Sequence, residues 1–278
     1  MTLEVILQVW ATVVGLALGS FLNVCIARMP EDRSVSRPPS HCPACGHRIR
    51  WYENIPVLSW VFLRARCSGC GSRISPLYPI IEVLMGLLAL LLFREIVPVY
   101  SLPALAAWAF YLVFVFMLVG STYIDLRHYI IPDQFTIFAI PFGFLGVVGL
   151  QWLGYDGQHA ITWQASLVGA LAGGGVLLVT IGAWWLVRRV EAMGFGDVKL
   201  LAMMGAFLGA IPAVPFILIG ACIIGSVIGL LLMLKRGSGL KTQVPFGPFL
   251  AITGVVYLFF GEALIRDFLP TWTWMAGQ

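Results

Sequence analysis

The sequence has few charged residues. Only 11% of its 278 residues are Asp, Glu, Lys or Arg, whereas a soluble domain usually carries about 25%. Hydrophobic residues make up 60% of the chain, and many lie in uncharged runs longer than the roughly 20 residues that a membrane-spanning helix needs. A soluble core does not require such runs, so the composition indicates a polytopic membrane protein. The net charge of +4 is too small to favour nucleic acid as a partner.

Several common catalytic motifs are also missing. The chain has four His residues, and none of them forms an H-E-x-x-H metal site. There is no G-x-S-x-G nucleophile elbow and no phosphate-binding loop. These absences disfavour the usual metalloprotease, serine-hydrolase and nucleotide-hydrolysing arrangements. The remaining candidates for chemistry are carboxylates and cysteines.

The apolar runs predict the membrane spans. The first, 5–27, follows the acidic Glu4 and is longer than the apolar region of a signal peptide, so we expect a retained span. Pro212 and Pro215 lie near the middle of run 200–234, which therefore contains one long helix or two shorter ones. The uncharged runs are 5–27, 96–124, 134–155, 157–187, 200–234 and 242–261, and run 76–93 is interrupted only by Glu82.

The distribution of basic residues favours two helices in run 200–234. With two helices there are eight spans, and all Lys and Arg residues except Arg94 and Arg266 fall on one side of the membrane. Basic loops normally face the cytoplasm. With one helix, Lys235, Arg236 and Lys241 would lie on the wrong side. We therefore expect about eight spans, with both termini periplasmic.

Two cysteine pairs mark the only sizeable polar segment, 28–75. The motif "CPAC" contains Cys42 and Cys45, and "CSGC" contains Cys67 and Cys70. Two C-x-x-C pairs at this separation predict a structural site in which four thiolates bind Zn²⁺. Disulfides or a redox motif are the alternative, but a cytoplasmic location disfavours them. His41 or His47 could replace one of these ligands, and Cys25 and Cys222 are expected to be buried packing residues within spans.

These features predict an all-α polytopic membrane protein with about eight transmembrane helices and a small cytoplasmic zinc-binding subdomain. We divide the chain into a first transmembrane helix (1–27), a cytoplasmic four-cysteine loop (28–75) and a multi-span membrane domain (76–278).

Four carboxylates lie at or within the membrane, where they are costly and usually functional. Asp133 follows Pro132 and is expected to cap the fourth span. For Glu82, a structural ion pair and a functional role in a polar cavity are equally favoured. Asp197, in "GFGDVK", is either a helix N-cap or functional, and Asp125 either ends a helix beside Arg127 or is functional.

Asp125 and Asp197 gain weight when they are considered together. In the eight-span topology both lie at the cytoplasmic face, Asp125 at the end of the third span and Asp197 at the start of the sixth. Two carboxylates brought close cannot both ionise, so they share one proton. One can then act as a base toward water while the other polarises a peptide carbonyl. The pair therefore permits aspartic protease chemistry.

The chain resembles the bacterial type IV prepilin peptidases over nearly its whole length. The resemblance rests on "GSFLNV" (19–24), the two cysteine pairs, "YPIIE" (78–82), the segment from Asp125 to "IPD", "GFGDVK" (194–199) and "PFGPFLA" (245–251). "GFGDVK" alone is less specific, since other intramembrane aspartic proteases share a G-x-G-D core.

The resemblance implies an enzyme of the bacterial inner membrane with Asp125 and Asp197 as catalytic residues. Its substrates are prepilins and pseudopilins, which it cleaves at the cytoplasmic face. It then methylates the new N-terminal amine with S-adenosylmethionine. With this resemblance, residues 28–75 are a possible methyltransferase region and residues 76–278 are the multi-span aspartic peptidase domain. The sequence alone assigns no residue to binding of the methyl donor. The candidate places are the cysteine loop, the cytoplasmic span ends and Glu82.

Three alternatives stay open at this stage. The first is a peptidase of this type without methyltransferase activity. The second is a proton-coupled transporter in which Asp125, Asp197 and Glu82 relay protons. The third is a zinc-stabilised assembly scaffold without chemistry. The sequence does not predict the oligomeric state.

Overall fold

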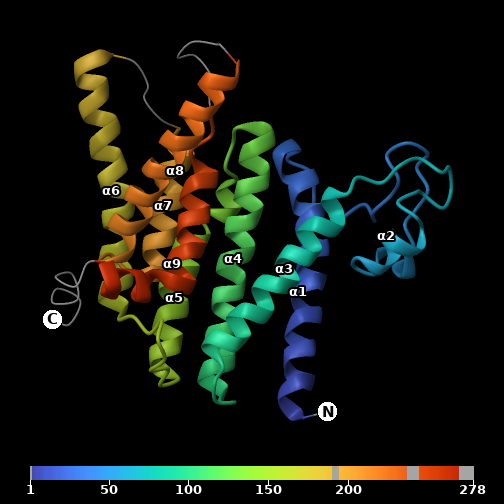
Figure 1. Cartoon of the computed structure of the whole chain (residues 1–278), viewed down its shortest axis with the longest axis horizontal. Coiled ribbons are helices and arrows are strands. Elements are labelled where there is room, and N and C mark those ends of the chain that lie inside the picture. Colours follow the sequence, from blue (N-terminus) through green and yellow to red (C-terminus); the bar gives the residue numbers. More distant parts are fainter. Residues whose placement is uncertain (1, 190–193, 237–243, 269–278) are drawn as a thin grey trace. The chain divides into compact units, whose positions relative to one another are not determined.

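The computed structural model describes residues 2–189, 194–236 and 244–268. These residues form helices joined by loops, with no β-strand among them (Figure 1). The predicted all-α class is therefore confirmed. The helices are α1 (Leu3–Arg28), α2 (Leu58–Phe62), α3 (Leu77–Ile96), α4 (Leu102–His128), α5 (Ala139–Trp152), α6 (Trp163–Arg188), α7 (Phe195–Leu208), α8 (Ala213–Arg236) and α9 (Gly247–Phe268), with 3-10 helices η1 (Met29–Glu31), η2 (Trp51–Asn54) and η3 (Asp133–Phe135).

The protein is a polytopic membrane protein. Six of the described helices are long and apolar enough to cross a membrane. The predicted division of run 200–234 is confirmed, because α7 ends at Leu208 and α8 begins at Ala213. However, α7 has only 14 residues, or about 21 Å of helix, which is less than the thickness of the hydrocarbon core. The count of eight spans therefore stays a prediction. Lys241 and the last ten residues, on which the predicted topology also depends, lie outside the described residues.

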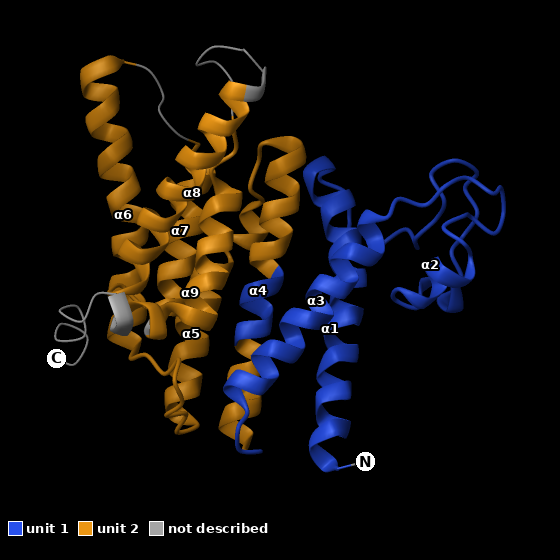
Figure 2. Ribbon diagram, in the orientation of Figure 1, with its two compact units in different colours: residues 1–100, 111–116 blue, residues 101–110, 117–278 orange. Residues whose placement is uncertain are grey.

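The chain forms two compact units (Figure 2). The first comprises residues 1–100 and 111–116, and the second comprises residues 101–110 and 117–278. The domain boundaries predicted from the sequence, at residues 27 and 75, follow the composition of the loops. They do not describe these two units and stay a prediction.

In the first unit, α1 packs closely on α3 through small residues. Gly15 and Gly19 lie four residues apart on α1, and a Cβ added at Gly19 would be only 2.6 Å from the Cα of Glu82. Such close backbone approach is typical of helix pairs in membranes. The packing therefore fixes the position of Glu82 on α3.

In the second unit, α7 is the central helix and contacts α5, α6, α8 and α9. All of its residues from Leu200 to Leu208 are buried. Gly169 of α6 and Gly205 of α7 lie so close that neither position has room for a Cβ. This packing holds α7 firmly, and Asp197 lies in its first turn.

Candidate active site and metal centre

Asp125 lies in the last turn of α4. The helix ends at His128, and the backbone N–H of Tyr129 donates to the Asp125 carbonyl at 3.0 Å. The side chain of Asp125 is buried, whereas Arg127 is exposed. No ion pair joins the two residues within the described part of the chain. An ion pair with Arg127 therefore does not explain Asp125.

Asp197 is the third residue of α7, and the N-cap of this helix is Gly194. The alternative prediction, in which Asp197 is the N-cap, is wrong. The helix begins two residues earlier because Phe195 and Gly196 already adopt helical geometry. The side chain of Asp197 is buried, and its surroundings rather than capping must explain it.

The two carboxylates lie close to one another. The charge of Asp125 acts on Asp197, so the structure brings together the pair predicted from the sequence. The backbone N–H of Gly247, the first residue of α9, donates to the Asp125 carboxylate. Ile131 lies against both Gly196 and Gly247, because a Cβ added at these positions would be 3.2 Å and 2.9 Å from its side chain. Three segments distant in sequence thus converge at the pair.

Asp133 does not cap a helix through its side chain. It instead accepts a charged hydrogen bond from Lys199, two residues beyond Asp197. The capping prediction for Asp133 is therefore wrong. The physical reason is that α5 begins only at Ala139, so the N-terminus that Asp133 was expected to cap lies six residues farther along the chain. The ion pair links the segment after α4 to the first turn of α7.

Gly247 offers a test of the pair's geometry. A Cβ added here would lie 2.6 Å from Oδ2 of Asp125, so the carboxylate must move. We expect Gly247→Ala to lower peptide cleavage by about 100-fold, the order of loss that follows when a catalytic group shifts by about 1 Å. Gly229→Ala is the matched control, because nothing lies within 4 Å of its added Cβ. Initial rates with a purified substrate check this, and equal rates for the two variants would contradict it.

The four predicted metal ligands form one cluster. The Sγ atoms of Cys42, Cys45, Cys67 and Cys70 all lie within 4.8 Å of one another. The Sγ atoms of Cys42 and Cys70 are 3.9 Å apart. A tetrahedral zinc site with Zn–S distances of about 2.3 Å requires sulfur atoms about 3.8 Å apart. The cluster therefore could hold a metal ion, and its donor set and spacing fit zinc.

Two knuckles with the same backbone hydrogen bonds form the cluster. The N–H of Cys42 donates to the carbonyl of His47 at 2.9 Å, and the N–H of Cys67 donates to that of Ser72 at 2.8 Å. Gly46 and Gly71 follow the second cysteine of each pair and have φ values of +71° and +72°. Only glycine adopts this conformation without strain. The repeated geometry presents both thiols of each pair toward the other knuckle.

Glu53 connects the two knuckles, and its side chain is only 8% exposed. It accepts hydrogen bonds from the Arg50 backbone N–H at 2.8 Å and from the Ser68 hydroxyl at 2.6 Å. These bonds, led by that from Arg50, lower the pKa of Glu53 to about 2. The His47 ring lies 3.3 Å from the same carboxylate. The His47 ring therefore interacts with Glu53, and the His41 ring lies beside the Pro39 carbonyl. Neither histidine belongs to the cluster of possible metal ligands.

The remaining residues singled out from the sequence are Cys25, Cys222 and Glu82. Cys25 is buried as expected, but Cys222 is exposed on α8, so its predicted burial is wrong; α8 turns this face away from the unit. Glu82 is buried and forms no ion pair within the described residues. Its carboxylate instead accepts the backbone N–H of Val57 at 2.7 Å and lines a cavity. Of the two predicted roles, the structural ion pair is thus absent.

Comparisons with known proteins identify the family of the chain. Residues 13–96 match the bacterial peptidase A24 N-terminal domain, and residues 111–230 match the type IV leader peptidase family. A prepilin leader peptidase/N-methyltransferase of Aeromonas hydrophila is 36% identical over 279 residues, covering 92% of this chain and 91% of the relative. The chain belongs to the type IV leader peptidase family.

Other relatives with the same name support membership in the family. That of Myxococcus xanthus (strain DK1622) is 43% identical over 238 residues, which cover 84% of this chain and 66% of the relative. That of Pseudomonas putida is 33% identical over 281 residues, with 91% of each chain covered. No solved structure matches the chain.

Within this member of the family, sequence reasoning missed three residues at the carboxylate pair. Ile131 and Gly247 lie in two of the segments on which the family resemblance rests, the segment from Asp125 to "IPD" and "PFGPFLA". Their spacing in the sequence does not show that they lie beside the two aspartates. Lys199 lies two residues beyond Asp197, and its ion pair with Asp133 joins positions 66 residues apart. The glycines of "PFGPFLA" and "GFGDVK" were the available signal.

Proposed function

We propose that this protein is a membrane aspartic endopeptidase that removes the basic leader from type IV prepilins and pseudopilins and then methylates the new N-terminal amine. The observation that carries the proposal is the buried pair Asp125 and Asp197. Neither carboxylate has a basic partner among the described residues. The names of relatives that match nearly the whole chain support both activities.

The proposed cleavage follows from the charge of the pair. Because two close carboxylates share one proton, one of them is ionised and the other is neutral. The ionised carboxylate takes a proton from water, which attacks the scissile carbonyl while the neutral carboxyl donates a hydrogen bond to its oxygen. Gly194 carries no side chain, and a Cβ added there would have only the Asp197 carboxylate within 4 Å, so a substrate backbone can approach the carboxylate from this side.

The location is proposed from the charge distribution. We place the protein in the bacterial inner membrane with both termini periplasmic and the carboxylates at the cytoplasmic face, because in the predicted eight-span topology the basic residues gather in loops on one side. A prepilin anchored by its own apolar helix would present its leader at that face.

Zinc and S-adenosylmethionine are the proposed bound groups. Cys42, Cys45, Cys67 and Cys70 would hold zinc, which supplies folding free energy to the loop and leaves no open position for catalysis. S-adenosylmethionine supplies the methyl group.

A single experiment tests both activities. The purified protein is incubated with a full-length prepilin and an isotopically labelled methyl donor, and the N-terminus of the product is analysed by mass spectrometry. We expect loss of the leader and the addition of a labelled methyl group. Cleavage without methylation would reject the methyltransferase part, and an intact prepilin would reject the peptidase.

A further inference from the structure

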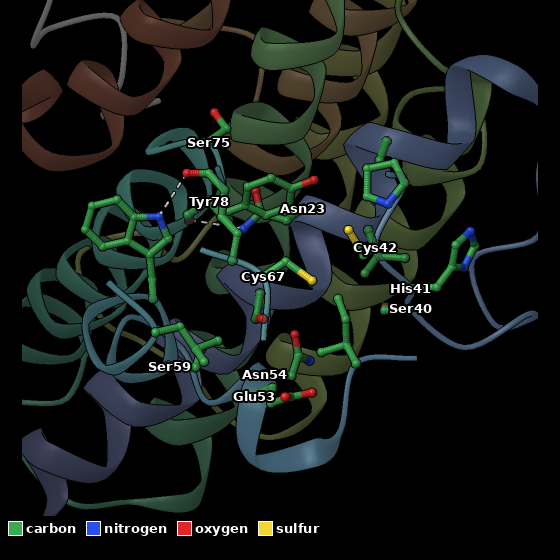
Figure 3. Close-up of a pocket in the computed structure, with 18 of the residues that line it drawn as sticks. Asn23, Ser40, His41, Cys42, Glu53, Asn54, Ser59, Cys67, Ser75 and Tyr78 are labelled. Carbon is green, nitrogen blue, oxygen red and sulfur yellow. Dashed lines mark hydrogen bonds between the residues drawn. The ribbon is translucent and has the colours of Figure 1, made fainter. Parts of the chain in front are cut away.

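The first unit contains a cavity of about 490 Å³ between the cysteine knuckles and the ends of α1 and α3. Cavities of roughly 300–1,000 Å³ are typical of small-molecule sites. Figure 3 shows Asn23 of α1 and Tyr78 of α3 beside the knuckle residues Cys42 and Cys67. The whole lining comes from residues 20–82, so the cavity does not depend on the second unit.

Glu82 is the distinctive residue of this cavity. It is only 7% exposed, and no basic side chain of the described residues lies within ion-pair distance. The Val57 N–H occupies one carboxylate oxygen at 2.7 Å, and Ser20 lies beside the carboxylate. A buried carboxylate without a counter-charge is costly. A cationic ligand in the cavity would supply that charge.

The other carboxylate of the lining is already used. Glu53 accepts hydrogen bonds from Arg50 and Ser68 and contacts His47. It therefore holds the two knuckles together and is not available to a ligand. Glu82 is left as the acidic group that a ligand can meet.

The rest of the lining favours a zwitterionic nucleoside over a basic peptide. Arg28, Arg33 and Arg73 also line the cavity. Arg33 is paired with Glu31, whereas Arg28 and Arg73 would repel a basic leader but attract a carboxylate. Trp60 and Tyr78 add aromatic surface of the kind that receives a nucleobase. S-adenosylmethionine carries a sulfonium cation, an amino-acid carboxylate and an adenine, so it matches each of these groups.

We propose that this cavity binds S-adenosylmethionine, with the carboxylate of Glu82 facing the sulfonium. This assignment rests on the methyltransferase activity proposed above and adds the place and the charge partner of the donor. When the amine nitrogen forms its bond to the methyl carbon, the S–C electron pair stays on sulfur and the amine loses a proton to water. The product, S-adenosylhomocysteine, is a neutral thioether at this atom, and the charge attraction to Glu82 is lost.

The charge difference between donor and product gives a binding test. In purified full-length protein, Glu82→Gln should weaken S-adenosylmethionine binding by about tenfold or more, the scale expected for loss of a charged contact. S-adenosylhomocysteine binding should change by less than about twofold, because the Gln amide oxygen can still accept from Val57. Glu95→Gln is the matched control, since Glu95 is exposed on the same helix and outside the lining. Calorimetry measures both dissociation constants.

A second variant tests the location independently of charge. Ala27 lines the cavity and is exposed, so a large side chain can be placed there without disturbing the core. Ala27→Trp should weaken both ligands by about tenfold or more by filling the cavity. Zinc content and thermal unfolding show whether each variant is folded.

The outcomes separate this inference from the proposed function. A wild-type protein that methylates pilin, with both variants binding the two ligands normally, overturns the cavity assignment alone. A selective rise in the KM for prepilin cleavage in Glu82→Gln, with donor binding unchanged, assigns the cavity to the leader and also overturns it. A wild-type protein that neither binds the donor nor methylates pilin overturns both the cavity assignment and the methyltransferase part of the proposed function.

Discussion

Asp197→Asn should reduce prepilin cleavage by about 1,000-fold or more, within the range lost when a general base is removed. The amide keeps nearly the same shape and volume, but it cannot ionise and cannot share the proton of the pair. Asp125→Asn should have the same effect. The double variant should be no worse than either single one, because residues that act as a unit are not additive.

The two aspartate variants also test whether the activities are separate. If methyl transfer has its own site, both variants should still methylate a pilin that is supplied already cleaved. The measurements are cleavage of full-length prepilin and methyl incorporation into the cleaved form. Asp156→Asn, at an exposed loop position of the same unit, is the control and should retain both activities.

Two results would change this interpretation. Robust cleavage by Asp197→Asn would remove Asp197 from the mechanism and leave its burial without a catalytic explanation. Loss of both activities in a folded variant would instead indicate one shared site, which would also contradict a donor cavity confined to the first unit.

Replacing any one of the four clustered cysteines should remove the metal. We expect about one Zn²⁺ per purified chain, and Cys70→Ser should reduce this content to near zero. Structural zinc contributes roughly 10–16 kcal/mol of apparent binding free energy in zinc-finger peptides. The loop has little core of its own, since Cys42 is its only buried hydrophobic residue between positions 29 and 75. Without zinc the knuckles should therefore lose their fold.

Limited proteolysis and metal analysis check this prediction. The loop contains Arg48, Arg50, Arg64 and Arg66, so trypsin should cut Cys70→Ser within the loop much faster than the wild type. Cys222→Ser is the control, because Cys222 is exposed on α8 and lies outside the cluster. Binding of S-adenosylmethionine should also be lost in Cys70→Ser, since Cys42 and Cys67 form part of the cavity wall. A fully active preparation without zinc would refute the assignment.

Some features could be predicted from local sequence because their physical causes are local. Long uncharged runs require helices in a membrane, where every backbone polar group must be satisfied within the segment. The C-x-x-C pairs, each followed by glycine, fix the knuckle geometry within a few residues, and the four thiols were correctly predicted to meet. The distribution of basic residues correctly favoured two helices in run 200–234, which the proline pair alone left open; the structure divides the run between Leu208 and Ala213.

Other features required the tertiary structure. The capping predictions for Asp133 and Asp197 failed because they depend on where a helix begins, which sequence patterns do not resolve exactly. Helix α7 begins two residues before Asp197, and α5 begins six residues after Asp133.

By itself, the sequence determined that this chain is an all-α membrane protein with a four-cysteine cluster and with carboxylates at or near the ends of its apolar runs. The tertiary structure decided which partners those groups have. It placed Gly247 and Ile131 at the aspartate pair and paired Lys199 with Asp133. It also buried Glu82 at a cavity with no basic side chain in ion-pair contact among the described residues. The reason is physical: hydrophobic periodicity and turn chemistry act over a few neighbouring residues, whereas charge pairing and cavity shape depend on packing between helices that are distant in the chain.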